Sequence, residues 1–182
     1  SSVAAACKAR DKFGTGRVAG SIGPLIASYR PDICPPVEQA SKIYEEKVDS
    51  IAPKVDILLV ETVCSLKQAK GVLAATDKSN KPVWISFSVD DVDGTKLRSG
   101  EKLEDVEAVI NNHLVEAVLI NCSPPEVVDN SLSILSKMGL AFGAYANGFS
   151  KISSEFLKTR PTVDALTARK DLGPEEYSNF VT

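Results

Sequence analysis

The sequence predicts an α/β fold, because short apolar stretches of strand length alternate with longer stretches of helical periodicity. The clearest apolar stretch, Ala117–Ile120, is partly β-branched and apolar on both faces, which is typical of a strand buried in a parallel sheet. Polar residues follow the stretches where such strands would end. The predicted strands are Arg17–Gly20, Val55–Val60, Pro82–Val89, Ala117–Ile120 and Leu140–Tyr145.

Helices are predicted between these strands from apolar residues at helical spacing. Ser65 with Gln68 fits a capping box, and so does Ser123 with Glu126, so each serine is expected to cap a helix. Pro124 suits the first position of the second helix. Further helices are predicted over 37–52 and 103–112, and over 1–13 and from 173 onward.

Alternating strands and helices form a parallel sheet, which is either open and doubly wound or closed as a (β/α)8 barrel. Two observations favour the barrel: polar side chains follow every strand, and no glycine-rich phosphate-binding sequence follows the first strand. A complete barrel takes about 250 residues, whereas this chain has 182. We therefore predict one domain over 1–182, an incomplete (β/α)8 barrel that lacks strands on both sides.

Composition narrows the functional classes. The net charge is −3 and no dense cluster of lysine and arginine occurs, which argues against a nucleic-acid partner. No apolar run reaches about 18 residues, so no membrane span is expected. The cysteines are widely spaced and form no CxxC pair, which indicates free thiols in a reducing cytoplasm. They are Cys7, Cys34, Cys64 and Cys122.

The candidate functional residues are the polar side chains at the C-terminal ends of the predicted strands, where α/β enzymes place their chemistry. Glu61 follows one strand, Asn121 and Cys122 follow another, and Asn147 follows the last. Simpler explanations exist for each type of residue. A lone buried cysteine is usually a small core residue, and a carboxylate such as Glu61 can serve as a charge near a helix N-terminus.

The acidic stretch Asp90–Asp93 is partly similar to a calcium-binding loop, with Glu101 at the twelfth position. Its sixth position is Thr95, where such loops have glycine. We therefore interpret this stretch as a solvated loop. The single histidine, His113, is expected at the surface or near a helix C-terminus and not as a metal ligand.

Five motifs occur in the order in which they occur in the homocysteine S-methyltransferases, and the chain resembles that family over about residues 17–182. They are Val18-Ala19-Gly20-Ser21-Ile22-Gly23-Pro24, Glu61-Thr62, Leu97-Arg98-Ser99-Gly100, Asn121-Cys122-Ser123 and Tyr145-Ala146-Asn147-Gly148. The resemblance implies a zinc-dependent barrel enzyme that methylates homocysteine and releases methionine. It also implies that this chain covers about strands three to seven.

The resemblance further implies a ligand set and a substrate site. In that family Zn²⁺ is held by three thiolates, of which Cys122 would be one, and the other two come from a Cys-Cys pair beyond this sequence. Zinc would lower the pKa of the homocysteine thiol, so that its thiolate attacks the methyl carbon of a sulfonium or other methyl donor. The implied substrate-binding residues are Glu61, for the ammonium group, with Ser21, Asn121, Tyr145 and Asn147 lining the pocket.

Two alternatives stay open at this point. The chain could be an inactive barrel fragment or an interaction module, because one thiolate cannot hold catalytic zinc tightly and an unclosed barrel exposes two strand edges. It could also be a barrel enzyme that works without metal, although the sequence offers no Ser/His/Asp or lysine-centred arrangement. The zinc content of the full product separates these possibilities.

Overall fold

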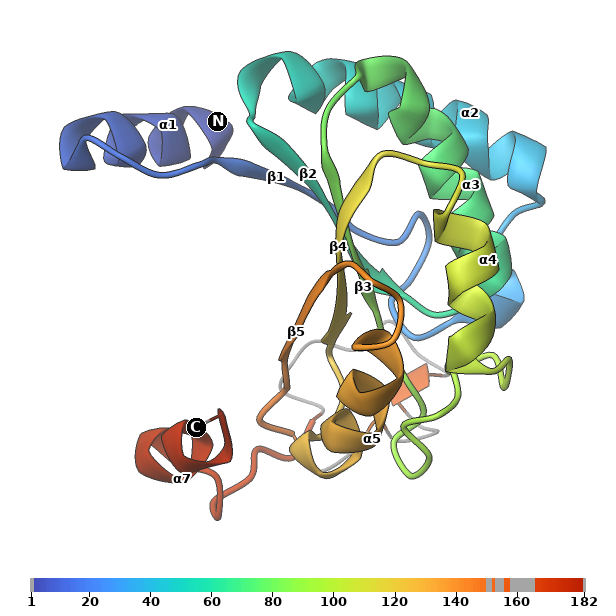
Figure 1. Cartoon of the computed structure of the whole chain (residues 1–182), viewed down its shortest axis with the longest axis vertical. Helices are drawn as coiled ribbons and strands as arrows, with labels where there is room; N and C mark the ends of the chain where they lie inside the picture. The colour runs from blue at the N-terminus through green and yellow to red at the C-terminus, as the bar shows by residue number, and fades with distance from the viewer. Residues whose placement is uncertain (1, 150–151, 153–155, 158–165, 182) are drawn as a thin grey trace.

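The computed structural model describes residues 2–149, 152, 156, 157 and 166–181. A five-stranded parallel sheet forms its centre, and each strand lies beside the next strand of the chain (Figure 1). The strands are β1 (Ala19–Ile22), β2 (Ile57–Val63), β3 (Val83–Phe87), β4 (Val115–Asn121) and β5 (Ala141–Tyr145). A doubly wound sheet reverses its strand order, so this order confirms the prediction of a partial barrel.

Helices cover one face of the sheet. Those that connect successive strands are α2 (Val37–Ile51), α3 (Leu66–Thr76), α4 (Val106–Ile110) and α5 (Pro125–Leu135). Figure 1 shows these four on one side of the sheet, whereas α1 (Ser2–Phe13) and α7 (Pro174–Val181) extend on the other side. Within the described ranges, no helix has the length and apolar character needed to cross a membrane.

The strand register divides the side chains of the sheet into two faces. The face toward the helices is apolar, and each of its central side chains is at most 2% exposed. These are Ile22, Leu58, Val60, Ile85, Phe87, Val118 and Ile120. The opposite face is less uniform. Its half-buried or exposed residues are Ser21, Leu59, Trp84, Leu119 and Tyr145, whereas Ser86 and Asn121 on the same face are buried. The hydrophobic core therefore lies between sheet and helices, and the opposite face is the one that lines the inside of a barrel.

The first strand begins two residues later than the predicted strand Arg17–Gly20, so Ser21 lies within β1. Gly20 explains the difference. Helix α2 and the residues after it pack so closely on β1 that a Cβ at Gly20 would overlap the side chain of Ile51. This glycine is therefore a packing residue within the strand.

Other boundaries also differ from the prediction. Strand β2 continues beyond Val60 to Val63, with irregular pairing to β3 between these two residues. Glu61 therefore lies within the strand and does not follow it. The predicted helix 103–112 is a turn of 3-10 helix, Leu103–Asp105, followed by the short α4. Similar single turns occur at Pro31–Ile33, Ala52–Lys54 and Asp77–Ser79.

One of the two predicted capping serines caps its helix. Ser65 Oγ accepts a hydrogen bond from the Gln68 N–H at 3.1 Å at the start of α3. Ser123 does not, because Pro124 occupies the cap position and α5 begins at Pro125. The Ser123 hydroxyl instead accepts from the Val89 N–H at 3.0 Å and joins the loop after β3 to the end of β4.

Gly94 lies in the loop after β3, where the chain packs against α5. A Cβ at this position would overlap the carbonyl oxygen of Val127 and lie 3.0 Å from Ser131 Oγ. We predict that Gly94→Ala lowers the free energy of unfolding by about 1–3 kcal/mol, because a carbonyl within a helix cannot move aside. Gly23→Ala is the control, since nothing lies within 4 Å of the added Cβ. Equal urea unfolding curves for the two variants would contradict the prediction.

Candidate active site at the ends of β2 and β4

Two strained residues mark the C-terminal edge of the sheet. Thr62, in the irregular part of β2, has φ 57°, and Cys122, directly after β4, has φ 52°. A positive φ is uncommon outside glycine, and for a β-branched residue such as threonine it is a true outlier. Strain of this kind concentrates at functional sites. The two side chains are also in contact, because Thr62 Oγ1 donates to Cys122 Sγ at 3.5 Å.

The side-chain amide of Asn121 joins the two strained residues. Its Oδ1 accepts from the Thr62 N–H at 3.1 Å and from Ser86 Oγ at 2.9 Å. Its Nδ2 donates to Thr62 Oγ1 at 3.0 Å and to Cys122 Sγ at 3.2 Å. Asn121 is fully buried. The four bonds use the full capacity of the amide, so its orientation is fixed.

The backbone of Cys122 is held from the other side. Its carbonyl oxygen accepts from Arg98 Nη2 and from Ser88 Oγ, each at 3.1 Å. Arg98 Nε also donates to Ser88 Oγ at 2.7 Å, so the three groups form one closed network. Charge-assisted bonds of this kind are about twice as strong as neutral ones. Cys122 is therefore fixed at both its sulfur and its carbonyl.

Asp91 completes this network, which corrects the prediction of a solvated acidic loop. Its carboxylate lies 2.5 Å from Arg98 Nη2, and the two side chains are only 11% and 10% exposed. Asp91 also accepts from the Ile152 N–H at 2.8 Å. The prediction was wrong at this residue because sequence spacing does not show that Arg98 folds back onto the loop. Asp93 does agree with the prediction of a solvated loop, because its ion pair with Lys96 is exposed.

Tyr29 lies on the outer side of the Arg98 network. The guanidinium carbon of Arg98 is 4.8 Å from the centre of the Tyr29 ring, a cation–π contact. Burial, and then the nearby sulfur of Cys122, raise the pKa of the Tyr29 hydroxyl, which keeps it protonated. A cleft of about 1040 Å³ opens beside these two residues and also contacts Lys67 and Glu101. The predicted substrate residues do not line this cleft.

Two of the predicted substrate residues, Ser21 and Tyr145, lie on the face of the sheet opposite the helices. Tyr145 is the register partner of Asn121 on β5. Burial raises the pKa of Tyr145 to about 12, the carboxylate of Glu61 adds to this, and a hydrogen bond with Ser86 opposes it. Glu61 and Tyr145 therefore lie close together. Ser21 is exposed on β1, on the same face.

Asn147 carries an unused hydrogen-bond donor. Its backbone N–H donates to the Ser123 carbonyl at 3.1 Å, and its Oδ1 accepts from the Phe149 N–H at 3.1 Å. Its Nδ2 is buried and has no partner among the described residues. Buried donors are nearly always paired, so an acceptor on a bound ligand would complete this group.

Cys122 fits one ligand of a metal but does not form a metal site by itself. Its half-buried sulfur accepts two hydrogen bonds, an arrangement that suits a thiolate. In the part of the chain that the structure describes, no group of three His, Cys, Asp or Glu side chains is placed to hold a metal. Cys64 is fully buried in the core, and this burial raises its pKa to about 12. His113 pairs with Asp77 at 2.8 Å.

Comparison with known proteins identifies the family. A model of the family described as homocysteine S-methyltransferase matches residues 1–181. The chain belongs to the homocysteine S-methyltransferase family.

Thr62, Arg98 and Tyr29 were absent from the sequence-based candidates for the site. Thr62 and Arg98 do stand inside the family motifs quoted above, but nothing in their spacing indicates that they meet Cys122.

Individual relatives agree with this assignment. Homocysteine S-methyltransferase 1 of Arabidopsis thaliana is 34% identical over 86 residues, which are 46% of this chain and 26% of that protein. A selenocysteine methyltransferase of Astragalus bisulcatus is 28% identical over 105 residues, 56% of this chain and 30% of that protein. The metallated form of the homocysteine methyltransferase MmuM from Escherichia coli superposes with a TM-score of 0.73 at 28% identity, over 86% of this chain and 59% of that chain. The chain thus spans only part of these family members.

The pair of Asp91 and Arg98 provides a test of the network behind Cys122. We predict that Asp91→Asn lowers the free energy of unfolding by about 3 kcal/mol, because it leaves the Arg98 charge nearly buried and unpaired. Asp93→Asn, in the same loop, is the matched control, since its pair with Lys96 is exposed and its loss should be much smaller. Chemical denaturation of both variants checks this, and an Asp91→Asn effect no larger than the control would refute it.

Proposed function

We propose that the protein is a homocysteine S-methyltransferase, which transfers a methyl group from a sulfonium or other methyl donor to the sulfur of homocysteine and gives methionine. The observation that carries the proposal is the state of Cys122. It is a strained cysteine at the end of a barrel strand, and its sulfur accepts hydrogen bonds from Asn121 and Thr62. Membership of the family supports the same activity.

We further propose that Cys122 is one of the thiolates that hold a Zn²⁺ ion in the whole protein. A solved structure of MmuM is described as its metallated form, which supports a metal in this family. When bound, zinc lowers the pKa of a coordinated thiol and so supplies a nucleophilic sulfur at neutral pH. The hydrogen bond from the Asn121 amide orients the Cys122 sulfur for this role.

The substrate side of the proposal uses the other face of the strand ends. The Glu61 carboxylate binds the ammonium group of homocysteine through charge-assisted hydrogen bonds. Tyr145, with its pKa raised to about 12, stays protonated and borders the same position. The unused Nδ2 of Asn147 suits the carboxylate of the amino acid. Ser21 lies on the same face, on β1, which is the neighbour of β2.

Asn121 acts on the protein in this proposal and not on the substrate, because its four hydrogen-bonding positions are in use. The small-molecule partners are homocysteine and the methyl donor. Neither a nucleic acid nor a membrane is part of the proposal. The cysteines of the described residues are free, which fits the reducing cytoplasm as the place of action.

The zinc assignment predicts the effect of Cys122→Ser in the whole protein. Bound zinc and methyl transfer should be lost together, because a serine hydroxyl is not deprotonated at neutral pH and is a poor zinc ligand. Metal analysis of the purified protein and a methionine assay measure the two quantities. Cys7→Ser, on the distant helix α1, is the control and should keep both. Retained turnover in Cys122→Ser would end the zinc mechanism.

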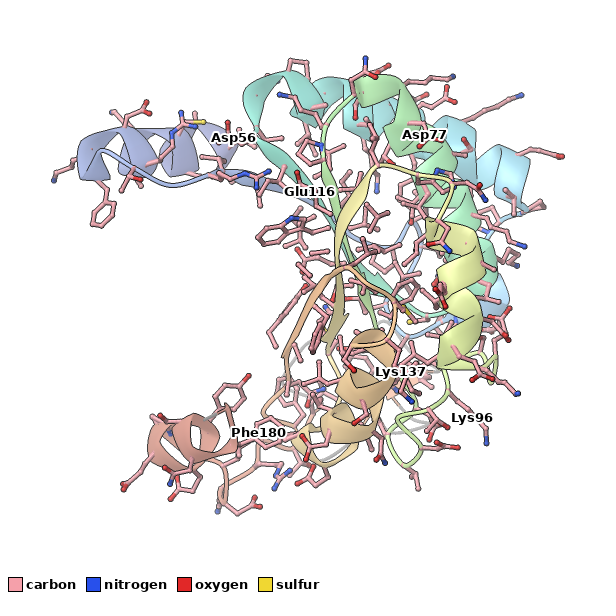
Figure 2. All side chains as sticks on the ribbon, in the orientation of Figure 1. Asp56, Asp77, Lys96, Glu116, Lys137 and Phe180 are labelled. Atoms are coloured by element: carbon pink, nitrogen blue, oxygen red, sulfur yellow. The ribbon has the colours of Figure 1, made fainter. Side chains whose placement is uncertain are left out.

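The ammonium assignment predicts that Glu61→Ala raises the KM for homocysteine by roughly 30- to 150-fold, which corresponds to about 2–3 kcal/mol of charge-assisted hydrogen bonding. The KM for the methyl donor should stay within about threefold. Glu116→Ala is the matched control, because Glu116 lies near the N-terminal end of β4, where it pairs with Arg17 (Figure 2). An unchanged KM for homocysteine would remove Glu61 from the pocket.

A further inference from the structure

Thr62 is held in a conformation that threonine adopts rarely, although glycine or asparagine would adopt it more easily. Its φ is 57°, and its side chain is β-branched and 5% exposed. The irregular pairing between β2 and β3 places this residue at the point where β2 meets the end of β4. The proposed function so far gives no role to the hydroxyl of this threonine.

The direction of each hydrogen bond around Thr62 follows from one fixed donor. The backbone N–H of Thr62 can only donate, so the Asn121 atom that it contacts at 3.1 Å is the oxygen Oδ1. The other atom of that amide is therefore Nδ2, which can only donate. It lies 3.0 Å from Thr62 Oγ1 and 3.2 Å from Cys122 Sγ, so both of these atoms act as acceptors toward it.

The hydroxyl proton of Thr62 is left with one acceptor among the contacts described, the Cys122 sulfur at 3.5 Å. The sulfur thus receives two donors, one from the amide and one from the hydroxyl, and both come from buried side chains. The order of donors begins at a backbone N–H within β2 and ends at the sulfur after β4. The direction of every hydrogen bond in this series is therefore set by the backbone N–H of Thr62.

We propose that Thr62 is a positioning residue for the Cys122 thiolate: its hydroxyl donates a hydrogen bond that orients the sulfur and stabilises its negative charge for metal binding. The inference rests on the proposed function, in which Cys122 is a zinc ligand. Groups that hydrogen-bond to metal ligands typically change metal affinity by about 10- to 100-fold when they are removed. Thr62 does not touch the substrate in this proposal, so its effect acts through Cys122.

The test measures Zn²⁺ affinity by chelator competition in the whole protein. Thr62→Val keeps the β-branched shape at the same φ and removes only the hydroxyl, and it should weaken Zn²⁺ binding by about tenfold. Thr62→Ser restores the hydroxyl and should lie within about threefold of the parent. Thr76→Val is the matched control, because Thr76 is also buried but its hydroxyl donates to the Leu73 carbonyl in α3. It should leave the Zn²⁺ affinity unchanged.

A second readout reports the sulfur directly. Co²⁺ in place of Zn²⁺ gives a thiolate-to-metal charge-transfer band, which should shift in Thr62→Val and return in Thr62→Ser. If Thr62→Val does not fold, Thr62→Ala removes the hydroxyl without burying a new methyl group against the amide, and it should show the same loss of affinity and the same shift.

The outcomes separate the two proposals. Parent-like Zn²⁺ affinity and an unshifted band in Thr62→Val overturn the role of the hydroxyl, provided that Cys122→Ser has lost the metal. A loss in Thr62→Ser as large as that in Thr62→Val also overturns it, because the methyl group would then be what matters. Full Zn²⁺ affinity in Cys122→Ser overturns the ligand assignment itself, and the inference about Thr62 with it.

Discussion

One buried amide, that of Asn121, connects the ends of β2 and β4, and the candidate site depends on it. Its oxygen accepts from the backbone of Thr62 and from Ser86, and its nitrogen donates to the Thr62 hydroxyl and the Cys122 sulfur. Leaving any of these buried groups unpaired costs about 1–3 kcal/mol. The amide therefore resists rearrangement. This resistance offsets the strain of two neighbouring residues with positive φ, which an isolated chain would relax.

The Arg98 network does for the carbonyl of Cys122 what Asn121 does for its sulfur. Arg98 and Ser88 both donate to that carbonyl, and Asp91 balances the charge of Arg98 in a nearly buried position. A cysteine fixed at two points loses little conformational freedom when it binds a ligand, which makes binding tighter. The loop after β3 thus supports the site. Its packing against α5 at Gly94 helps to hold the loop in place.

The strand ends present different chemistry on their two sides. Glu61 and Tyr145 lie close together, and Asn147 after β5 carries an unused donor; we propose that this set binds the charged groups of an amino acid. On the side of Arg98 lies the cleft of about 1040 Å³, which contacts Tyr29 and Lys67. The sulfur of Cys122 stands between the network that holds it and the face that we propose for the substrate. This placement is what a thiolate ligand needs, since it must be held by the protein and stay open to a metal.

The sequence by itself determined the alternation of strands and helices, the order of motifs and the candidate status of Cys122, Glu61 and Asn147, because hydrophobic period and short motifs are local properties. It misplaced the first strand, because the packing of α2 on Gly20 is a contact between distant segments. It also missed the roles of Thr62, Arg98 and Asp91. Thr62 and Arg98 act through hydrogen bonds to Asn121 and Cys122 across 24 to 60 positions of the chain, and Asp91 acts through Arg98, 7 positions away. Thr62 also has a positive φ that only the folded backbone imposes. The tertiary structure decided these, since a hydrogen bond between distant residues leaves no periodic trace in the sequence.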